Sequence, residues 1–287
     1  MKMCSISVAV NMGGLNYKDL NVFVRLMLYG QTHGRDAWGV GRQDMQVLKQ
    51  PDAFDELMVK PSLYSAYRAF LRKAIGQKWI VGHNRQATRG SPKQNKNNHP
   101  LPIIINHKLV AWIIHNGVVE ATKPKYDVPE SMTDSYIIAN SIARHYKGNL
   151  YRAVVDSLES GEYTGTAKIV VWNNKSLTVA NTYPIRGYHV KEYGSFFYAS
   201  WKEQFERQGI ESYKVEAGTI SNFSLAKGHF VSRFNFRKIK YGKYVQTYES
   251  GGWSPVKKII GGGSKKKAKK KKHRVEEEEE YLWRWYL

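Results

Sequence analysis

The amino-acid sequence predicts an α+β fold in which mostly antiparallel sheets and helices form separate layers. Helical and strand segments are mixed up to Leu158, whereas mainly strand segments follow from Thr164 onward. Consecutive strands joined by short connections pair as antiparallel hairpins, and helices grouped away from them imply layers. Hydrophobic residues make up 42% of the 287 residues, so a sizeable packed core is expected.

The first part of the chain mixes strands with helices. Ser5 to Val10 is mostly apolar and is expected to be a strand. Leu20 to Tyr29 carries apolar residues at helical spacing, and Asp19 just before it is expected to cap this helix. The next expected elements are a loop at 30–41 that becomes a short strand, a helix at Ser62 to Ile75, a strand at Trp79 to Asn84 and a polar loop at 89–100.

A β-hairpin is expected where two apolar runs, Leu101 to Ile105 and Leu109 to Ile114, are joined by three polar residues. Thr133 to Ala143 begins with a Thr-Asp pair suited to a helix N-cap. The later expected elements are helices at Leu150 to Leu158 and Trp201 to Arg207, and strands at Ala167 to Trp172, Ser176 to Asn181, Ser195 to Ala199, Lys214 to Ile220 and His229 to Phe236.

The chain divides into one domain with extensions. Residues 4–225 are expected to form the domain, and residues 226–260 a C-terminal strand extension. A Gly-Gly-Gly-Ser linker follows at 261–264, and then a block of lysines and a block of glutamates. As a helix this tail would oppose the helix dipole, so disorder is expected over 261–287.

Composition narrows the class of protein. One cysteine allows no internal disulfide and no cysteine-based metal cluster, which fits a reducing compartment. No apolar run approaches the ~18 residues of a membrane span, so a soluble cytoplasmic protein without a membrane partner is expected. The net charge of +21 is spread over the main body, and it suits either nucleic-acid binding, which the tail could share, or simple solubility.

Four short segments carry candidate chemistry when they are taken together. They are Met3-Cys4-Ser5-Ile6, the run 82–90 (GHNRQATRG), His115-Asn116-Gly117 and Thr133-Asp134-Ser135. Each alone has an ordinary structural reading, because a lone cysteine is usually a buried filler and an Asn-Gly step is usually a turn.

The residue types in these segments fit attack on an amide. The Cys4 thiolate is a strong nucleophile, and an N-terminal residue supplies its own base in an α-amine of pKa roughly 8. The Asn116 side chain and the Gly117 backbone N–H can stabilise the oxyanion that forms. Arg85 can bind an α-carboxylate bidentately and Asp134 can pair with an α-ammonium, so free L-glutamine is the expected substrate.

In these segments the chain resembles the class II glutamine amidotransferases, members of the N-terminal-nucleophile hydrolases. All four segments stand in the family's order, and the resemblance covers about residues 4–225. Three further segments are similar to family motifs, namely 33–39 (HGRDAWG), 196–200 (FFYAS) and 215–220 (VEAGTI).

The resemblance implies a four-layer αββα sandwich with the nucleophile at the end of a central strand. It implies Cys4 as nucleophile, with its freed α-amine as base, and Asn116 and Gly117 as the oxyanion hole. The implied cycle forms a thioester, releases ammonia and hydrolyses the thioester to glutamate, and it requires no metal or cofactor.

The resemblance also implies the residues that bind the substrate. Arg85 and Asp134 match the positions that hold the glutamine carboxylate and amino group, and Thr88 and Arg89 fall where the family has further carboxylate contacts. About 60 residues follow the matched region, which is few for an acceptor domain. A separate ammonia-acceptor synthase is therefore the expected partner.

Three positions depart from the family pattern. Residues 1–3 precede Cys4 and are expected to be removed as a leader, because otherwise Cys4 has no free amine. His33 stands where arginine is usual, and Arg89 stands where histidine is often found.

Two alternatives stay open at the level of sequence. One is another N-terminal-nucleophile amidohydrolase with a different amide substrate, although Arg85 and Asp134 together favour a free amino acid. The other is a non-catalytic binding or scaffold protein that keeps the fold, retains Met1 and uses its basic surface.

Overall fold

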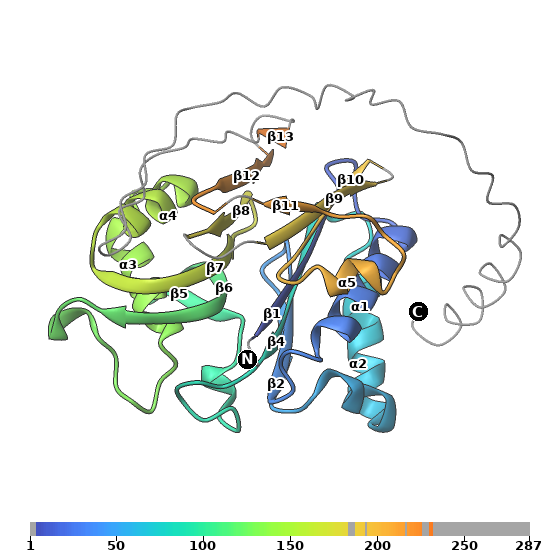
Figure 1. Cartoon of the computed structure of the whole chain (residues 1–287), viewed down its shortest axis with the longest axis horizontal. Helices are drawn as coiled ribbons and strands as arrows, with labels where there is room; N and C mark the ends of the chain where they lie inside the picture. Colours follow the sequence, from blue (N-terminus) through green and yellow to red (C-terminus); the bar gives the residue numbers. More distant parts are fainter. Residues whose placement is uncertain (1–3, 183–186, 193, 216, 226–229, 232–287) are drawn as a thin grey trace, which may run out of the picture.

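The computed structural model describes residues 4–182, 187–192, 194–215, 217–225 and 230–231. Two antiparallel sheets lie in the middle of this part of the chain, with helices on their outer sides (Figure 1). The expectations for the leader at 1–3, for most of the extension at 226–260 and for the tail at 261–287 lie outside the described residues.

The first sheet has seven strands in the order β11-β9-β10-β1-β4-β2-β3, and every neighbouring pair is antiparallel. In that order the strands are β11 (Tyr213–Val215), β9 (Gly187–Glu192), β10 (Ser195–Ala199), β1 (Ser5–Val10), β4 (Trp79–Arg85), β2 (Ala37–Arg42) and β3 (Val47–Gln50). The N-terminal strand β1 is therefore central, between β10 and β4.

The second sheet has six strands in the order β13-β12-β8-β7-β6-β5, again all antiparallel. Its strands are β13 (Phe230–Val231), β12 (Ile220–Ser224), β8 (Ser176–Asn181), β7 (Tyr163–Trp172), β6 (Lys108–Ala121) and β5 (Leu101–Ile105). The expected hairpin is confirmed as β5 and β6, with a register shift between Ile103 and Ile104.

The helices form the two outer layers of the molecule. Three helices lie beside the first sheet, α1 (Tyr17–Gly30), α2 (Pro61–Arg72) and α5 (Glu203–Glu206), and two lie beside the second, α3 (Ser135–His145) and α4 (Leu150–Glu159) (Figure 1). Short 3-10 helices occupy Phe54–Val59, Asn95–Asn97 and Pro124–Tyr126. No helix of the described part is long and apolar enough to cross a membrane. The expected αββα arrangement of four layers is confirmed.

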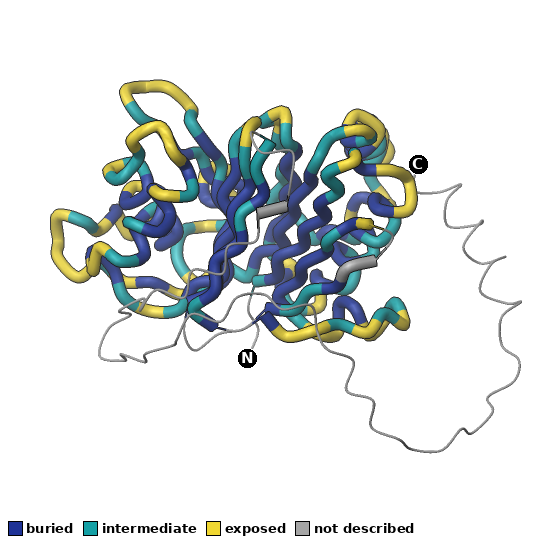
Figure 2. The backbone as a smooth tube through the Cα atoms, turned by 90° about the horizontal axis from the view of Figure 1, so that it is seen from above, coloured by how far each residue is buried: buried dark blue, intermediate teal, exposed yellow. Residues whose placement is uncertain are grey.

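Three apolar cores separate these four layers. One joins α1 and α2 to the first sheet, one joins α3 and α4 to the second sheet, and the third lies between the sheets. Along β1 the side chains alternate, so Ile6 and Val8 enter the core between the sheets while Ala9 packs in the core beneath α1. Figure 2 shows the resulting burial along the strands. Each fully buried aliphatic side chain contributes about 1.5–3 kcal/mol to stability.

The start of α1 differs from the expected one. Asn16, not Asp19, is the N-cap, and its side chain accepts hydrogen bonds from the Lys18 and Asp19 backbone N–H groups. The Asp19 carboxylate instead accepts a hydrogen bond from the Asn16 N–H and completes a capping box. Such a box is typically worth about 1 kcal/mol or more, which explains why the helix begins three residues earlier than its apolar pattern.

Two strand expectations are also corrected. The strand expected to end at Ile114 continues as β6 to Ala121, so His115, Asn116 and Gly117 lie inside it and pair with β7. The single strand expected at 214–220 is two strands in different sheets, β11 and β12. The left-handed backbone of Gly218 lies between them and redirects the chain.

Candidate active site

Polar residues occupy one end of the layer between the two sheets. Cys4 precedes β1 by one residue, and its alternation with Ile6 and Val8 directs its side chain into this layer. The same alternation places other polar side chains there, an even number of residues from a member of the inter-sheet core on each strand: His83 and Arg85 on β4, Asn116 on β6, Lys168 on β7 and Ser200 after β10.

The Cys4 side chain contacts the backbone that follows β4. Its Sγ accepts a hydrogen bond from the Gln86 N–H at 3.2 Å and lies 3.3 Å from the Gln86 carbonyl oxygen, to which the thiol donates. The Cys4 carbonyl accepts from Trp201 Nε1 at 3.0 Å. Burial raises the pKa of the thiol to about 11, although the Gln86 N–H and the Arg85 charge act in the opposite direction. The thiol therefore needs a base to react near neutral pH.

Asn116 is tied to the same strand as Cys4 through one hydroxyl. Its Nδ2 donates to Ser200 Oγ at 3.1 Å, and that oxygen also accepts from the Ile6 N–H at 3.0 Å. Asn116 is only 1% exposed, yet its Oδ1 has no hydrogen-bond partner. An amide whose second polar atom is buried and unpaired is poised to meet a polar ligand.

Gly117 meets the facing strand too closely for any other residue. Its φ is +150°, and a β-carbon there would lie 1.9 Å from the Thr166 carbonyl oxygen. The opposite residue, Ala167, directs both its N–H and its C=O toward Thr182 on the other side of β7. Ala167 and Gly117 are therefore opposite each other without exchanging backbone hydrogen bonds.

Arg85 holds the loop that follows β4. Its guanidinium donates to Asn98 Oδ1 at 2.8 Å, to the Arg89 carbonyl at 2.7 Å and to the Gly90 carbonyl at 2.8 Å. Burial lowers the pKa of Arg85, and the charges of Cys4 and Asp134 act to raise it. A guanidinium has five N–H donors, so donors remain for a ligand after these three bonds.

Asp134 lies before α3 but does not cap it with its side chain. Its Oδ2 accepts from the Val119 N–H at 3.0 Å, and its Oδ1 accepts from the Thr133 hydroxyl at 3.2 Å. Its charge acts on the pKa of both Cys4 and Arg85, which places the carboxylate within electrostatic range of both groups. The structure thus brings Cys4, Arg85 and Asp134 into one neighbourhood.

Thr88 and Arg89 lie in the loop after β4. Thr88 is exposed. The Arg89 side chain pairs with Asp127 at 3.1 Å and donates to the Val128 carbonyl, and its own carbonyl accepts from Arg85. The Arg89 guanidinium is therefore engaged by the segment before α3 rather than by Cys4 or Asn116.

Three buried histidines lie near this end of the molecule, and the ring of one of them, His115, contacts Ser135 of α3 at 2.8 Å on the other face of β6. The rings of His83 and His99 lie 4.2 Å apart, and the His83 Nε2 lies 3.0 Å from the His115 carbonyl oxygen. Burial lowers the pKa of all three, that of His83 to about 3, so all are neutral near pH 7. Within the described residues no cluster of His, Cys, Asp or Glu is suited to hold a metal ion.

Sequence reasoning missed two residues of the site, Lys168 and Trp201. Trp201 contacts Cys4, and Lys168 lies against both the Ser200 carbonyl and the Trp201 ring. A lysine in the apolar run Ala167 to Trp172, on the face shared with Val170, is the signal that could have pointed to it.

Comparison with known proteins adds to this geometry. The chain is 32% identical over 90 residues to glutamine–fructose-6-phosphate aminotransferase of Clostridium perfringens, and 30% identical over 107 residues to that of Caldanaerobacter subterraneus. These matches cover 29% and 35% of this chain but only 14% and 17% of the relatives. No protein-family model matches the chain.

The fold is shared with solved amidotransferase structures. Glutamine phosphoribosylpyrophosphate amidotransferase from B. subtilis superimposes with a TM-score of 0.58 at 15% identity, over 78% of this chain and 48% of that chain. Part of this chain is therefore similar in sequence to glutamine-dependent aminotransferases, and its fold is similar to that of a glutamine amidotransferase. A structure titled as the allosteric regulatory enzyme of purine biosynthesis has a TM-score of 0.59 over the same share of this chain and 47% of its own. Both solved structures are only 15% identical to this chain, so their likeness to it concerns the fold alone.

Proposed function

We propose that this domain hydrolyses L-glutamine to glutamate and ammonia through a thioester on Cys4. The observation that carries the proposal is the meeting of four groups at one end of the inter-sheet layer. A thiol, a buried amide with an unpaired atom, a guanidinium and a carboxylate are held there by Cys4, Asn116, Arg85 and Asp134.

The first step needs a base for the thiol, whose pKa is about 11 when buried. We propose that residues 1–3 are removed and that the α-amine of Cys4 takes the thiol proton. The thiolate sulfur then bonds to the side-chain carbonyl carbon of glutamine. The proton passes to the departing nitrogen, the C–N bond breaks and ammonia leaves, so the acyl group remains on Cys4 as a thioester.

The oxyanion formed in this step requires N–H donors. We assign this role to Asn116 and to the backbone of Gly117. If the Asn116 amide is turned by 180°, the Ser200 hydroxyl donates to Oδ1 and both hydrogens of Nδ2 become free for the oxyanion. Losing one such donor typically costs about 3 kcal/mol in the transition state.

The two ends of the amino acid meet opposite charges. We assign the α-carboxylate to Arg85, which keeps N–H donors beyond its three bonds to the loop, and the α-ammonium to Asp134. Thr88 remains a further proposed carboxylate contact from the adjacent loop. Arg89 contributes through its carbonyl, which orients Arg85, and its side chain would have to leave Asp127 to reach the substrate.

Water then attacks the thioester, glutamate leaves and Cys4 regains its thiol. We propose that the ammonia is used by a separate acceptor enzyme. The use of the ammonia by an acceptor is supported by the names of the aminotransferase relatives, which pair glutamine with a second compound, fructose 6-phosphate. The cytoplasmic location and the nucleic-acid contact remain predictions from composition alone.

Ammonia release from L-glutamine by the purified protein tests the proposal. The first residue of each preparation is identified from its intact mass. Protein that begins at Cys4 should release ammonia and glutamate in equal amounts, while protein that retains Met1 should be inactive. Cys4→Ala and Cys4→Ser should lose activity by at least about 1000-fold.

The control is Lys175→Met, which changes an exposed lysine in the turn between β7 and β8. Its activity should equal that of the wild-type protein. Protein with a free Cys4 amine that releases no ammonia would contradict the proposed function.

A further inference from the structure

Lys168 is a buried lysine whose ammonium donates to a backbone carbonyl rather than to a carboxylate. It is 3% exposed, and its Nζ donates to the Ser200 carbonyl at 2.9 Å. The same Nζ lies 4.5 Å from the centroid of the Trp201 ring, in cation–π geometry. Burial lowers its pKa to about 8, so most of it stays charged at neutral pH. Buried lysines are rare because the ammonium loses its hydration, so packing does not account for this residue.

Lys168 spans the gap between the two sheets. It extends from β7, where it pairs with Asn116 on one side and Asn181 on the other, toward the segment that follows β10 in the first sheet. Asn116 makes the same crossing to Ser200. The two side chains therefore fasten the same short segment, 200–201, from the opposite sheet.

Segment 200–201 also binds both the nucleophile, Cys4, and the proposed oxyanion donor, Asn116. Ser200 makes two hydrogen bonds with Ile6: its Oγ accepts from the Ile6 N–H at 3.0 Å, and its own N–H donates to the Ile6 carbonyl at 3.1 Å. Its Oγ also receives the Asn116 amide, and the Trp201 indole N–H binds the Cys4 carbonyl. A shift of segment 200–201 would move the nucleophile and the oxyanion donor relative to each other.

We propose that Lys168 is a positioning residue for the glutaminase reaction, whose ammonium fixes Ser200 and Trp201 so that Cys4 and Asn116 keep their reactive separation. The proposal rests on the proposed function. It assigns Lys168 no contact with glutamine, so the residue acts on the chemical step rather than on substrate binding.

The first test is a comparison of Lys168→Met with Lys168→Arg. Methionine keeps the length and apolar body of the chain but loses the charge and the donor, whereas arginine retains a cation that can bond a carbonyl and stack on an indole. A misplacement of about 1 Å can cost roughly 100-fold in rate, so Lys168→Met should lower kcat about 10- to 100-fold. KM for glutamine should stay within about twofold, since Lys168 makes no contact with the bound substrate.

The conservative variant distinguishes positioning from mere packing. Lys168→Arg should recover kcat to within about fivefold of wild type, because its guanidinium can replace both contacts of the ammonium. Lys175→Met, which removes an exposed lysine of the neighbouring turn, should leave kcat and KM unchanged. A kcat for Lys168→Met equal to that of the control would overturn the inference, as would a loss that appears only in KM.

A double-mutant cycle tests the route of the effect. Trp201→Phe keeps a ring beside Lys168 but removes the N–H that binds the Cys4 carbonyl. If Lys168 acts through this segment, the double variant should lose less than the product of the two single losses. Independent, multiplicative losses would contradict the proposed route.

Folding is checked by the thermal unfolding midpoint of each variant. Should Lys168→Met not fold, Trp201→Phe alone decides, and an unchanged kcat in that variant would overturn the inference. Failure of the proposed function has a different signature, because then wild type with a free Cys4 amine releases no more ammonia than Cys4→Ala. In that case the inference falls with it.

Discussion

Gly117 and Thr166 approach each other on β6 and β7 so closely that a β-carbon on Gly117 would lie 1.9 Å from the Thr166 carbonyl oxygen. That oxygen belongs to the backbone of a central strand and cannot swing aside as a side chain would. The glycine therefore permits the close strand approach at the site, beside Asn116.

Gly117→Ala should destabilise the protein by at least about 2 kcal/mol, through the clash and the strained φ together. The free energy of unfolding in urea measures this loss. Gly148→Ala is the matched control, since Gly148 also has a positive φ of +85° but nothing lies within 4 Å of its β-carbon position. It should cost only about 1 kcal/mol. Equal losses in the two variants would contradict the steric argument.

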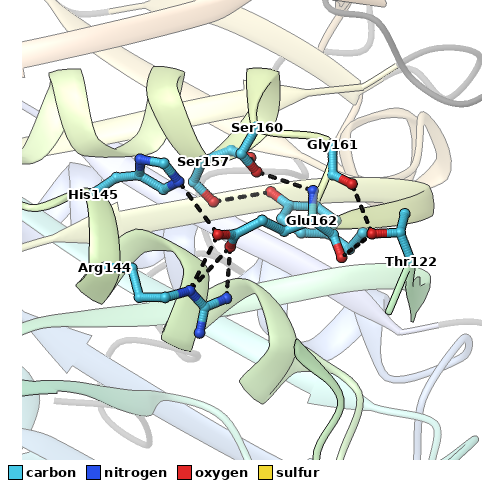
Figure 3. A network of polar contacts seen from close by, with 8 residues as sticks. Thr122, Arg144, His145, Ser157, Ser160, Gly161 and Glu162 are labelled. Atoms are coloured by element: carbon cyan, nitrogen blue, oxygen red, sulfur yellow. Dashed lines mark hydrogen bonds and ion pairs between the residues drawn. The ribbon is translucent and has the colours of Figure 1, made fainter. Parts of the chain in front are cut away.

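Glu162 makes part of the stability of the second sheet and its helices dependent on pH. Its carboxylate pairs with Arg144 at 2.6 Å and lies 3.6 Å from His145 Nε2, and its carbonyl accepts from Thr122 (Figure 3). Burial acts to raise the pKa of Glu162, but hydrogen bonds from Arg144 and Ser141 and the charges of Arg144 and His145 together outweigh it, so the pKa is below the ordinary 4.5.

A carboxylate whose pKa is lowered by folding stabilises the protein fully above its unfolded pKa and loses that contribution as the pH falls through the folded one. The wild-type protein should therefore lose stability below about pH 4.5. In Glu162→Gln this part of the pH dependence should be absent, as measured by urea unfolding between pH 3 and 7 (about the usable range). Glu211→Gln, at an exposed position, should keep the wild-type profile.

Arg85→Lys should weaken glutamine binding. A lysine ammonium cannot bond a carboxylate bidentately while it also holds the Asn98 side chain and the Arg89 carbonyl, as Arg85 does. We expect kcat/KM to fall roughly 100-fold, mainly through a higher KM. Steady-state ammonia release measures both constants, and Arg35→Lys, in an exposed ion pair with Asp55, should change neither. A loss confined to kcat would argue against a binding role.

Asp36→Asn should loosen the start of the loop after β4. The Asp36 carboxylate accepts from the Ala87 N–H at 2.7 Å and from Gln86 Nε2 at 2.9 Å, directly beside the Cys4 contact. Bonds to a charged group contribute about 1.5–3 kcal/mol each, so KM for glutamine should rise roughly tenfold or more. Asp52→Asn removes a partly exposed pair with Lys60 at the surface and should have little effect. Equal KM values in the two variants would contradict this role of Asp36.

The local pattern of residue types along the sequence was enough to predict most helices and strands. Ser5 to Val10, Ser176 to Asn181 and Ser195 to Ala199 are strands with the expected bounds, and the hairpin of β5 and β6 is present, because each has strand-forming residues and clear turn signals. The pattern failed where contacts distant in sequence decide. Pairing with β7 keeps Asn116 and Gly117 in a strand, although Asn-Gly is by itself a turn sequence.

The sequence by itself determined which residues carry the candidate chemistry: Cys4, Arg85, Asn116 and Asp134 stand in short segments whose order resembles one family. Only the tertiary structure decided how they are held. The contacts of Cys4 with Gln86 and Trp201, and those of Lys168 with segment 200–201, join residues 32 to 197 positions apart. No local periodicity encodes such pairs, because they arise only when two sheets stack and their inward faces meet.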